Sequence, residues 1–215
     1  MKRRAFFVAL LAASGTASAH GSIQGIDHFS AGLLHPLVEP THLISLVALA
    51  LMIGQRGISR AESALLAFAA GMLIGLCCAA LGWIFDAELA LLVLATLTGG
   101  AVAMSLALPA FAYAVVAAAF GAGVGMGSNP DAFHGGALLA ALSGAGIGAS
   151  LCLLGIASVV NSLKKSWLLI LVRVVGSWTS ASSILVLALW LSGKHLQAPA
   201  DAPPPGAAVK MDTTR

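Results

Sequence analysis

The sequence predicts an all-α integral membrane protein, with six transmembrane helices that follow a cleaved signal peptide. Mean hydropathy is +0.97, and only 9% of the residues are charged, whereas soluble domains carry about 25% charged residues. Hydrophobic residues make up 59% of the 215-residue chain, more apolar surface than a soluble fold of this length can bury. Six apolar segments, each near the ~20 residues that a spanning helix needs, follow the N-terminal region.

The first 19 residues have the three parts of a secretory signal peptide. Lys2, Arg3 and Arg4 form a charged start, and Ala5–Ala13 is an apolar core that is too short to span a bilayer. Ala17-Ser18-Ala19 matches the small-residue cleavage pattern. We therefore expect a mature chain that begins at His20, with an uncleaved anchor as the alternative.

The transmembrane domain is expected over residues 20–196. Its first helix is predicted to be broken near Pro36-Pro40, because proline interrupts a helix. The boundary between the third and fourth helices rests mainly on Pro109, within an almost continuous apolar run. The six segments are Phe29–Gly54, Ala64–Phe85, Leu89–Leu108, Pro109–Met126, Gly136–Val160 and Trp167–Leu191. Residues 197–215 contain four prolines and little apolar mass, so this tail is expected to be disordered.

Small residues indicate where the helices touch. Gly71 with Gly75, and Gly144 with Gly148, have the spacing that lets helix backbones approach closely in lipid. We expect these pairs to pack within one chain, although a homo-oligomer remains an alternative. Arg173 lies six residues into the last segment. Its side chain is expected to snorkel to the membrane surface, and pairing with a carboxylate or a carbonyl is the alternative.

Loop charges give the orientation, because cytoplasmic loops carry an excess of Lys and Arg. Arg56 and Arg60 lie between the first and second helices, and Lys164 and Lys165 lie between the fifth and sixth. Both loops are placed in the cytoplasm if the mature N-terminus and the C-terminus are outside. The expected location is the inner (plasma) membrane of a bacterium, which the chain crosses several times.

This topology places every histidine and most acids outside or near the outer membrane face. Such a mouth should concentrate divalent cations. The less specific alternative is that histidines and acids gather at helix ends in many membrane proteins. The residues concerned are His20, Asp27, His28, His35, Glu39, His42, Asp86, Glu88, Asp131, His134 and His195.

The stretch Leu34–His42, which reads LHPLVEPTH, is the most informative part of the chain. Ionisable groups at the edge of a membrane span are costly and are usually functional. Its imidazoles and carboxylate, from His35, Glu39 and His42, suit a divalent transition metal. A metal-binding vestibule is therefore the first hypothesis.

The spacing in this stretch predicts that the three side chains converge. Pro40 suits the first turn of a helix, which places Glu39 at the positive end of that helix. His42 then lies within reach of Glu39 on the same face. His35 is expected in an extended or kinked lead-in, because a residue before proline avoids the helical region.

A second candidate lies in the glycine-rich turn before the fifth helix. His134 ends the run Gly127–His134, and Asp131 comes three residues earlier. Either side chain is a candidate to complete the coordination of the ion. The alternative for Asp131 is that it only caps the start of the helix.

Together these residues resemble the HupE/UreJ family of nickel transport proteins. The likeness covers most of the mature chain, including a histidine soon after the signal peptide and the six helices. The motifs that carry it are His35-Pro36 with His42, Glu88 at the start of the third helix, Phe133-His134-Gly135 before the fifth, and Arg173 with Gly176 in the last.

The chain departs from the family pattern at both motifs. The first normally reads HP-xx-G-x-DH, and here Glu39 replaces the glycine and Thr41 replaces the aspartate. The second normally continues to another histidine-glycine and a glutamate, which Gly136–Leu139 replaces. Thr41 carries no charge, whereas Glu39 is a candidate to supply one.

The resemblance implies an inner-membrane permease for a divalent transition metal, with nickel first and cobalt second. The metal would bind at the His/Glu outer mouth, and a link to hydrogenase or urease maturation would follow. The alternative is a non-transporting accessory protein, such as a sensor or metal chaperone for metalloenzyme assembly. The metal ion is cargo here, and no prosthetic group is expected.

Other classes of function lack the sequence features they need. An intramembrane enzyme is not expected, because the chain has neither an H-E-x-x-H run nor a G-x-S-x-G elbow. The expected partners are the metal ion and the lipid bilayer. Nucleic acid is not expected, since the chain has no basic patch with interleaved aromatic residues.

Overall fold

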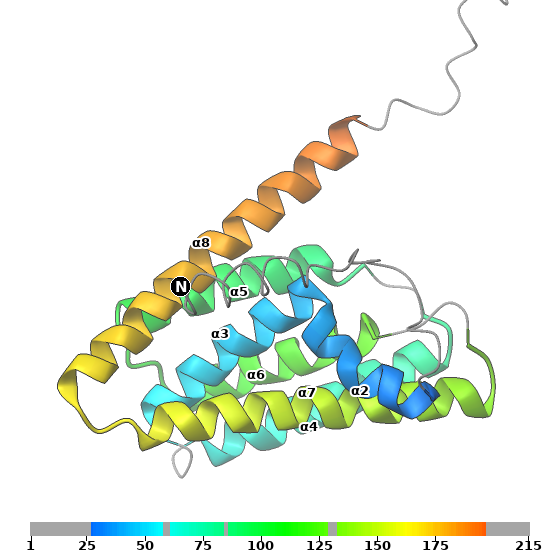
Figure 1. The fold of residues 1–215 in the computed structure, drawn as a ribbon, viewed down its shortest axis with the longest axis horizontal. Helices are drawn as coiled ribbons and strands as arrows, with labels where there is room; N and C mark the ends of the chain where they lie inside the picture. The colour runs from blue at the N-terminus through cyan, green and yellow to red at the C-terminus, as the bar shows by residue number, and fades with distance from the viewer. Residues whose placement is uncertain (1–26, 58–60, 84–85, 129–132, 197–215) are drawn as a thin grey trace, which may run out of the picture.

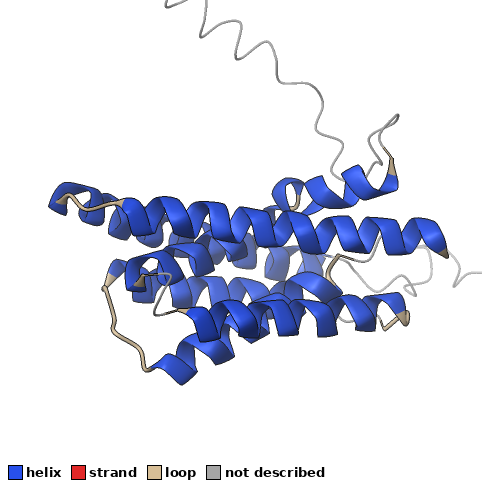
Figure 2. Cartoon of the chain, turned by 90° about the horizontal axis from the view of Figure 1, so that it is seen from below, coloured by secondary structure: helices blue, strands red, loops and turns tan. Residues whose placement is uncertain are grey.

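A computed structural model describes residues 27–57, 61–83, 86–128 and 133–196 of the chain, with the side chains of residues 193–196 left out. These residues fold into helices joined by short loops, without a strand (Figure 2). The predicted signal peptide, Asp131 and the proline-rich tail lie outside the described residues. The helices are α2 (His28–Val38), α3 (Pro40–Arg56), α4 (Glu62–Ala80), α5 (Glu88–Ala103), α6 (Ala110–Met126), α7 (Gly136–Ser162) and α8 (Ser166–Leu196).

The helices confirm the all-α membrane fold with a broken first helix. By length and composition α4, α7 and α8 are able to cross a membrane, and α2 with α3 forms a fourth candidate span that is bent by 69°. The other two helices, α5 and α6, are apolar but shorter, with 16 and 17 residues. The helices correspond one to one with the six predicted segments when α2 and α3 are counted as one.

The predicted break at Pro109 is confirmed. α5 ends at Ala103, and Pro109 is the extended residue that precedes the first turn of α6, with φ −67° and ψ 154°. Proline lacks the N–H that would continue a helix from the preceding residues. The nearly continuous apolar run is therefore two antiparallel helices.

The core of the molecule is α3, which lies in the middle of the bundle (Figure 1). It packs against α7, α5 and α8. Between Ser45 and Gly54 every residue except Val47 is buried. A helix that is buried on all sides is usually apolar on all sides. The polar residues near the two ends of α3 are therefore candidates for a functional role.

Glycines set the closest helix contacts. A Cβ atom on Gly121 of α6 would collide with the carbonyl oxygen of Phe68 on α4. One on Gly144 of α7 would collide with the carbonyl oxygen of Phe29 on α2. Gly71 of α4 packs in the same way on the carbonyl oxygen of Ala118, so both predicted glycine pairs contact another helix of the same chain.

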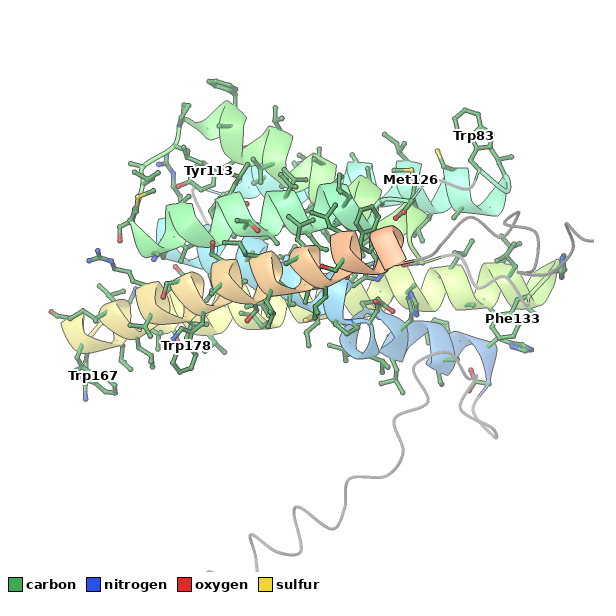
Figure 3. All side chains as sticks on the ribbon, turned by 90° about the horizontal axis from the view of Figure 1, so that it is seen from above. Trp83, Tyr113, Met126, Phe133, Trp167 and Trp178 are labelled. Carbon is green, nitrogen blue, oxygen red and sulfur yellow. The ribbon has the colours of Figure 1, made fainter. Side chains whose placement is uncertain are left out.

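The loops separate to the two ends of the bundle. In Figure 3, Trp83, Met126 and Phe133 lie toward one end, and Tyr113 and Trp167 lie toward the other. This is the alternation that the predicted topology requires.

Two arginines form contacts at the end of the bundle where Tyr113 lies. Arg56 lies over the Tyr113 ring, 4.9 Å from its centroid, and donates to the carbonyl oxygen of Leu108 at 3.2 Å. Arg173 Nε donates to the carbonyl oxygen of Ala103 at 2.8 Å. The alternative of pairing with a carbonyl is therefore observed for Arg173, whose side chain is also exposed, and snorkelling stays a prediction. The last carbonyl groups of α5 have no partner within the helix, and the negative end of the helix dipole favours a cation such as Arg173 at this position.

Candidate functional site

The chain bends between α2 and α3 at a single residue, Glu39, and we call this bend the elbow. Glu39 has an extended backbone, with φ −77° and ψ 113°, because Pro40 follows it. Pro40 takes the first position of α3, as predicted. Figure 1 shows the result: α2 folds back from the start of α3 and lies along α7.

His35 differs from the expectation, because it lies in the last turn of α2 and not in an extended lead-in. Pro36 follows it inside the helix. The residue four before Pro36 is Gly32, which has no side chain and packs on the backbone of Ala141 in α7. Packing along α7 therefore keeps α2 helical through Pro36, although a residue before proline prefers an extended backbone. The chain bends instead at Glu39.

The elbow brings the two histidines of the predicted motif together. The rings of His35 and His42 meet edge to face, with centroids 5.3 Å apart and an interplanar angle of 80°. Nε2 of His35 and Nδ1 of His42 are buried, and neither has a hydrogen-bond partner among the described residues. Buried polar atoms are nearly always paired, so the two rings are only partly satisfied in the folded chain.

A cavity of about 250 Å³ lies beside His42 at the start of α3. It collects three carboxylates and one imidazole from segments that are distant in the sequence. Such a set attracts cations and matches the ligand preferences of divalent transition metals. The cavity is lined by Glu39, Thr41, His42, Asp86, Ala87, Glu88, Leu91 and Gly127.

The start of α5 supplies two of the carboxylates. The hydroxyl of Thr41 donates to Oε1 of Glu88 at 3.3 Å, and Oδ1 of Asp86 accepts from the backbone N–H of Glu88 at 3.3 Å. Negative charge is favoured at the N-terminus of a helix. Sequence reasoning placed both acids at this face without joining them to the candidate site, because it gave no information on which helices are neighbours.

Gly127, at the end of α6, makes room for the His42 ring. A Cβ atom at this position would lie 2.6 Å from Nε2 of His42. Nε2 therefore lies against Gly127, which lines the cavity, while Nδ1 is buried. Sequence reasoning missed this role, and the one available signal was a glycine at the end of an apolar segment.

His134 lies away from the elbow. It is exposed in the loop before α7, and its neighbour Phe133 packs on His28, with ring centroids 4.6 Å apart. His28 begins α2, at the opposite end of that helix from the elbow. Across the described part of the chain, no three His, Cys, Asp or Glu side chains are close enough to hold one metal ion. The site as folded offers neighbouring ligands, not a closed coordination shell.

Comparison with known proteins identifies the family. The family model described as HupE / UreJ protein matches residues 8–186. The chain belongs to the HupE/UreJ family. No curated protein and no solved structure matches it. The resemblance that the histidine motifs predicted is thus confirmed over the whole helical bundle except the end of α8.

The geometry explains how this HupE/UreJ protein differs at its first motif. Thr41, which stands where the family aspartate is expected, is only 2% exposed and binds Glu88 through its hydroxyl. Glu39 lines the same cavity as Glu88. The negative charge absent at position 41 is therefore present on neighbouring side chains of the cavity.

Proposed function

We propose that this protein is an inner-membrane permease for a divalent transition metal, with nickel as the first candidate and cobalt as the second. The HupE/UreJ family to which it belongs is associated with nickel and cobalt uptake for hydrogenase and urease. The observation that carries the proposal is the cavity whose lining includes His42 and the carboxylates of Glu39, Asp86 and Glu88.

Ligand exchange at the elbow would take the ion out of water in two stages. The carboxylates first raise the local concentration of the dication. Imidazole nitrogens, which nickel and cobalt prefer over water, then replace part of the hydration shell. Nε2 of His42 lies against Gly127, which lines the cavity, and the ring of His35 packs on the ring of His42. Small movements of the elbow would be enough to bring both rings to one ion.

His134 and Asp131 are proposed as accessory ligands. The loop that carries them begins at Gly127, which lines the cavity. His35, Glu39 and His42 remain the main ligands of the proposal.

The orientation follows from the loop charges. Arg56 and Lys164 lie at the end of the bundle opposite the cavity, so the cavity faces outward if the basic loops are cytoplasmic. A dication that moves inward gains ~4.6 kcal/mol at a potential of 100 mV, because each charge gains ~2.3 kcal/mol. That energy corresponds to a concentration ratio on the order of a thousand, which is sufficient without ATP hydrolysis.

Uptake of radioactive nickel, in a bacterial strain that lacks other nickel importers, tests the proposal. His35→Ala and His42→Ala should abolish accumulation while the protein still inserts into the membrane. His28→Ala is the matched control, because His28 is an exposed histidine of the same helix as His35. Normal import by both elbow variants would exclude the elbow as the site.

A non-transporting metal sensor or chaperone is the second candidate. The altered residues at positions 39 and 41, and the open ligand arrangement, favour it over an efficient importer. Purified protein in liposomes with an imposed membrane potential separates the two. A chaperone or sensor would bind nickel at the surface without moving it into the lumen, whereas a permease would accumulate it there.

A further inference from the structure

Ser45 has a buried hydroxyl group that the proposed site does not yet use. It lies on α3 one turn after His42 and is 0% exposed. Its Oγ atom has no hydrogen-bond partner among the residues that the structure describes. An unpaired buried hydroxyl costs free energy, so its presence in the most buried helix of the bundle requires a reason.

Two other buried serines, Ser183 and Ser128, each form a hydrogen bond to a carbonyl oxygen four residues earlier. Ser183, which is also 0% exposed, donates to the carbonyl oxygen of Thr179 four residues earlier, at 2.8 Å. Ser128 donates in the same way to the carbonyl oxygen of Val124, at 2.7 Å. This local bond is available to a helical serine, and Ser45 does not make it. The Ser45 hydroxyl is therefore available to another partner.

The spacing along α3 puts Ser45 one turn after His42, on the same side of the helix. Residues three apart on a helix are neighbours on its surface, and helical side chains lean toward the N-terminus. Ser45 thus leans toward His42, whose Nδ1 atom is also buried and unpaired. Two unpaired polar groups, one of them able to both donate and accept, thus belong to positions one turn apart on one helix, with no hydrogen bond between them in the folded chain.

Metal binding at Nε2 gives this pair a function. A neutral imidazole that binds an ion through Nε2 carries its proton on Nδ1. Histidine ligands normally donate this second N–H to an acceptor, which fixes the tautomer and the direction of the ring. We propose that Ser45 is a positioning residue whose hydroxyl accepts the Nδ1–H of His42 when Nε2 of His42 holds the metal ion in the cavity.

This inference rests on the proposed function and adds a residue to it. His35 Nε2 is the competing acceptor, because it is also buried and unpaired. It belongs to α2, on the other side of the elbow, so its distance from His42 changes whenever the elbow moves. Ser45 keeps its position relative to His42 because both belong to α3.

Nickel titration of the purified full-length protein in detergent tests the inference, with Ser45→Ala as the main variant. Loss of an acceptor behind a histidine ligand typically lowers metal affinity 10- to 100-fold, and we expect a loss in that range. Ser45→Thr keeps the hydroxyl and should restore affinity to within a few-fold. Ser183→Ala is the matched control, and its affinity should equal that of the wild type.

The melting temperature of the metal-free protein distinguishes this role from a purely structural one. If Ser45 only stabilised the fold, Ser45→Ala would melt at a lower temperature than the wild type. Replacing an unpaired buried hydroxyl by a methyl group removes its desolvation cost. Metal-free Ser45→Ala should therefore melt at the wild-type temperature or higher, although it binds nickel more weakly. The visible absorption of bound Co²⁺ should also differ from that of the wild type, because the His42 ring is no longer held in one direction.

The outcomes distinguish the role of Ser45 from the metal site at the elbow on which it rests. Wild-type affinity in Ser45→Ala, with normal nickel binding by the wild type, would overturn the role of Ser45 and leave the elbow site intact. An equal loss in Ser45→Ala and Ser45→Thr would also overturn it, because the hydroxyl would then not matter. Absence of nickel binding by the wild type would overturn the elbow site, and the role of Ser45 with it.

Discussion

The hydroxyl of Thr41 donates a hydrogen bond to the carboxylate of Glu88 at 3.3 Å, and this contact joins the first turn of α3 to the first turn of α5. The two residues are 47 apart in the sequence. At the other end of the same helices Gln55 donates to the carbonyl oxygen of Val102 at 3.2 Å, again 47 residues away. The two helices therefore run parallel in a single register, which places Glu88 at the cavity.

Neutralising Glu88 should impair metal uptake strongly. Glu88→Gln removes one negative charge from the cavity and keeps the shape of the side chain, so radioactive nickel uptake should fall at least about tenfold. Glu62→Gln is the matched control, because Glu62 is an exposed glutamate that also begins a helix. Equal uptake by the two variants would show that the charge of Glu88 has no role in the site.

Gly127→Ala should displace the His42 ring without unfolding the bundle. The added Cβ atom would lie 2.6 Å from Nε2 of His42, the nitrogen that lies against this glycine. We expect a clear loss of nickel affinity in detergent titrations, with a melting temperature near that of the wild type. A Cβ atom on Gly155 of α7 would meet nothing within 4 Å, so Gly155→Ala should bind nickel normally. Unchanged affinity in Gly127→Ala would contradict the assigned orientation of His42.

Glu39→Gln should impair uptake more than Thr41→Ala. Glu39 is a charged side chain in the wall of the cavity, whereas Thr41 contributes only a hydroxyl that binds Glu88. We expect about tenfold slower uptake for the first variant and a few-fold effect for the second, measured at the same expression level. Equal and mild effects would mean that Glu39 does not replace the aspartate of the family motif.

Gly121→Ala tests the close packing of α4 on α6. Its Cβ atom would meet the carbonyl oxygen of Phe68, which belongs to the backbone and cannot rotate away. Overpacking of this kind costs typically ~1–3 kcal/mol, so the melting temperature in detergent should fall clearly. Gly155→Ala should melt at the wild-type temperature or slightly higher, since alanine is the better helix former. A normal melting temperature for Gly121→Ala would show that the two helices are less closely packed than described.

The sequence was sufficient for most of the fold, because proline and hydropathy act locally. Pro109 separates α5 from α6, and Pro40 begins α3, as predicted. The conformation of His35 was predicted wrongly, since the packing of Gly32 on α7 overrides the preference of a residue before proline. Local rules contain no information about a neighbouring helix that holds the backbone in place.

The candidate site was predicted only in part for a related reason. The motif spacing predicted that His35 and His42 lie close together, and in the structure their rings are in contact. The parts contributed by other helices, Glu88 and Gly127, depend on which helices are adjacent, and no short-range pattern gives that information. His134 and Asp131 stay predictions as ligands, the first exposed in its loop and the second outside the described residues.

Calorimetric titration of nickel into the purified wild-type protein and into His42→Ala is the most direct test of the site at the elbow. The wild type should give a saturable isotherm, and His42→Ala should lose most of the heat while its melting temperature shows that it is folded. Saturable binding that is identical in both proteins, or no binding by the wild type, would contradict the site described here.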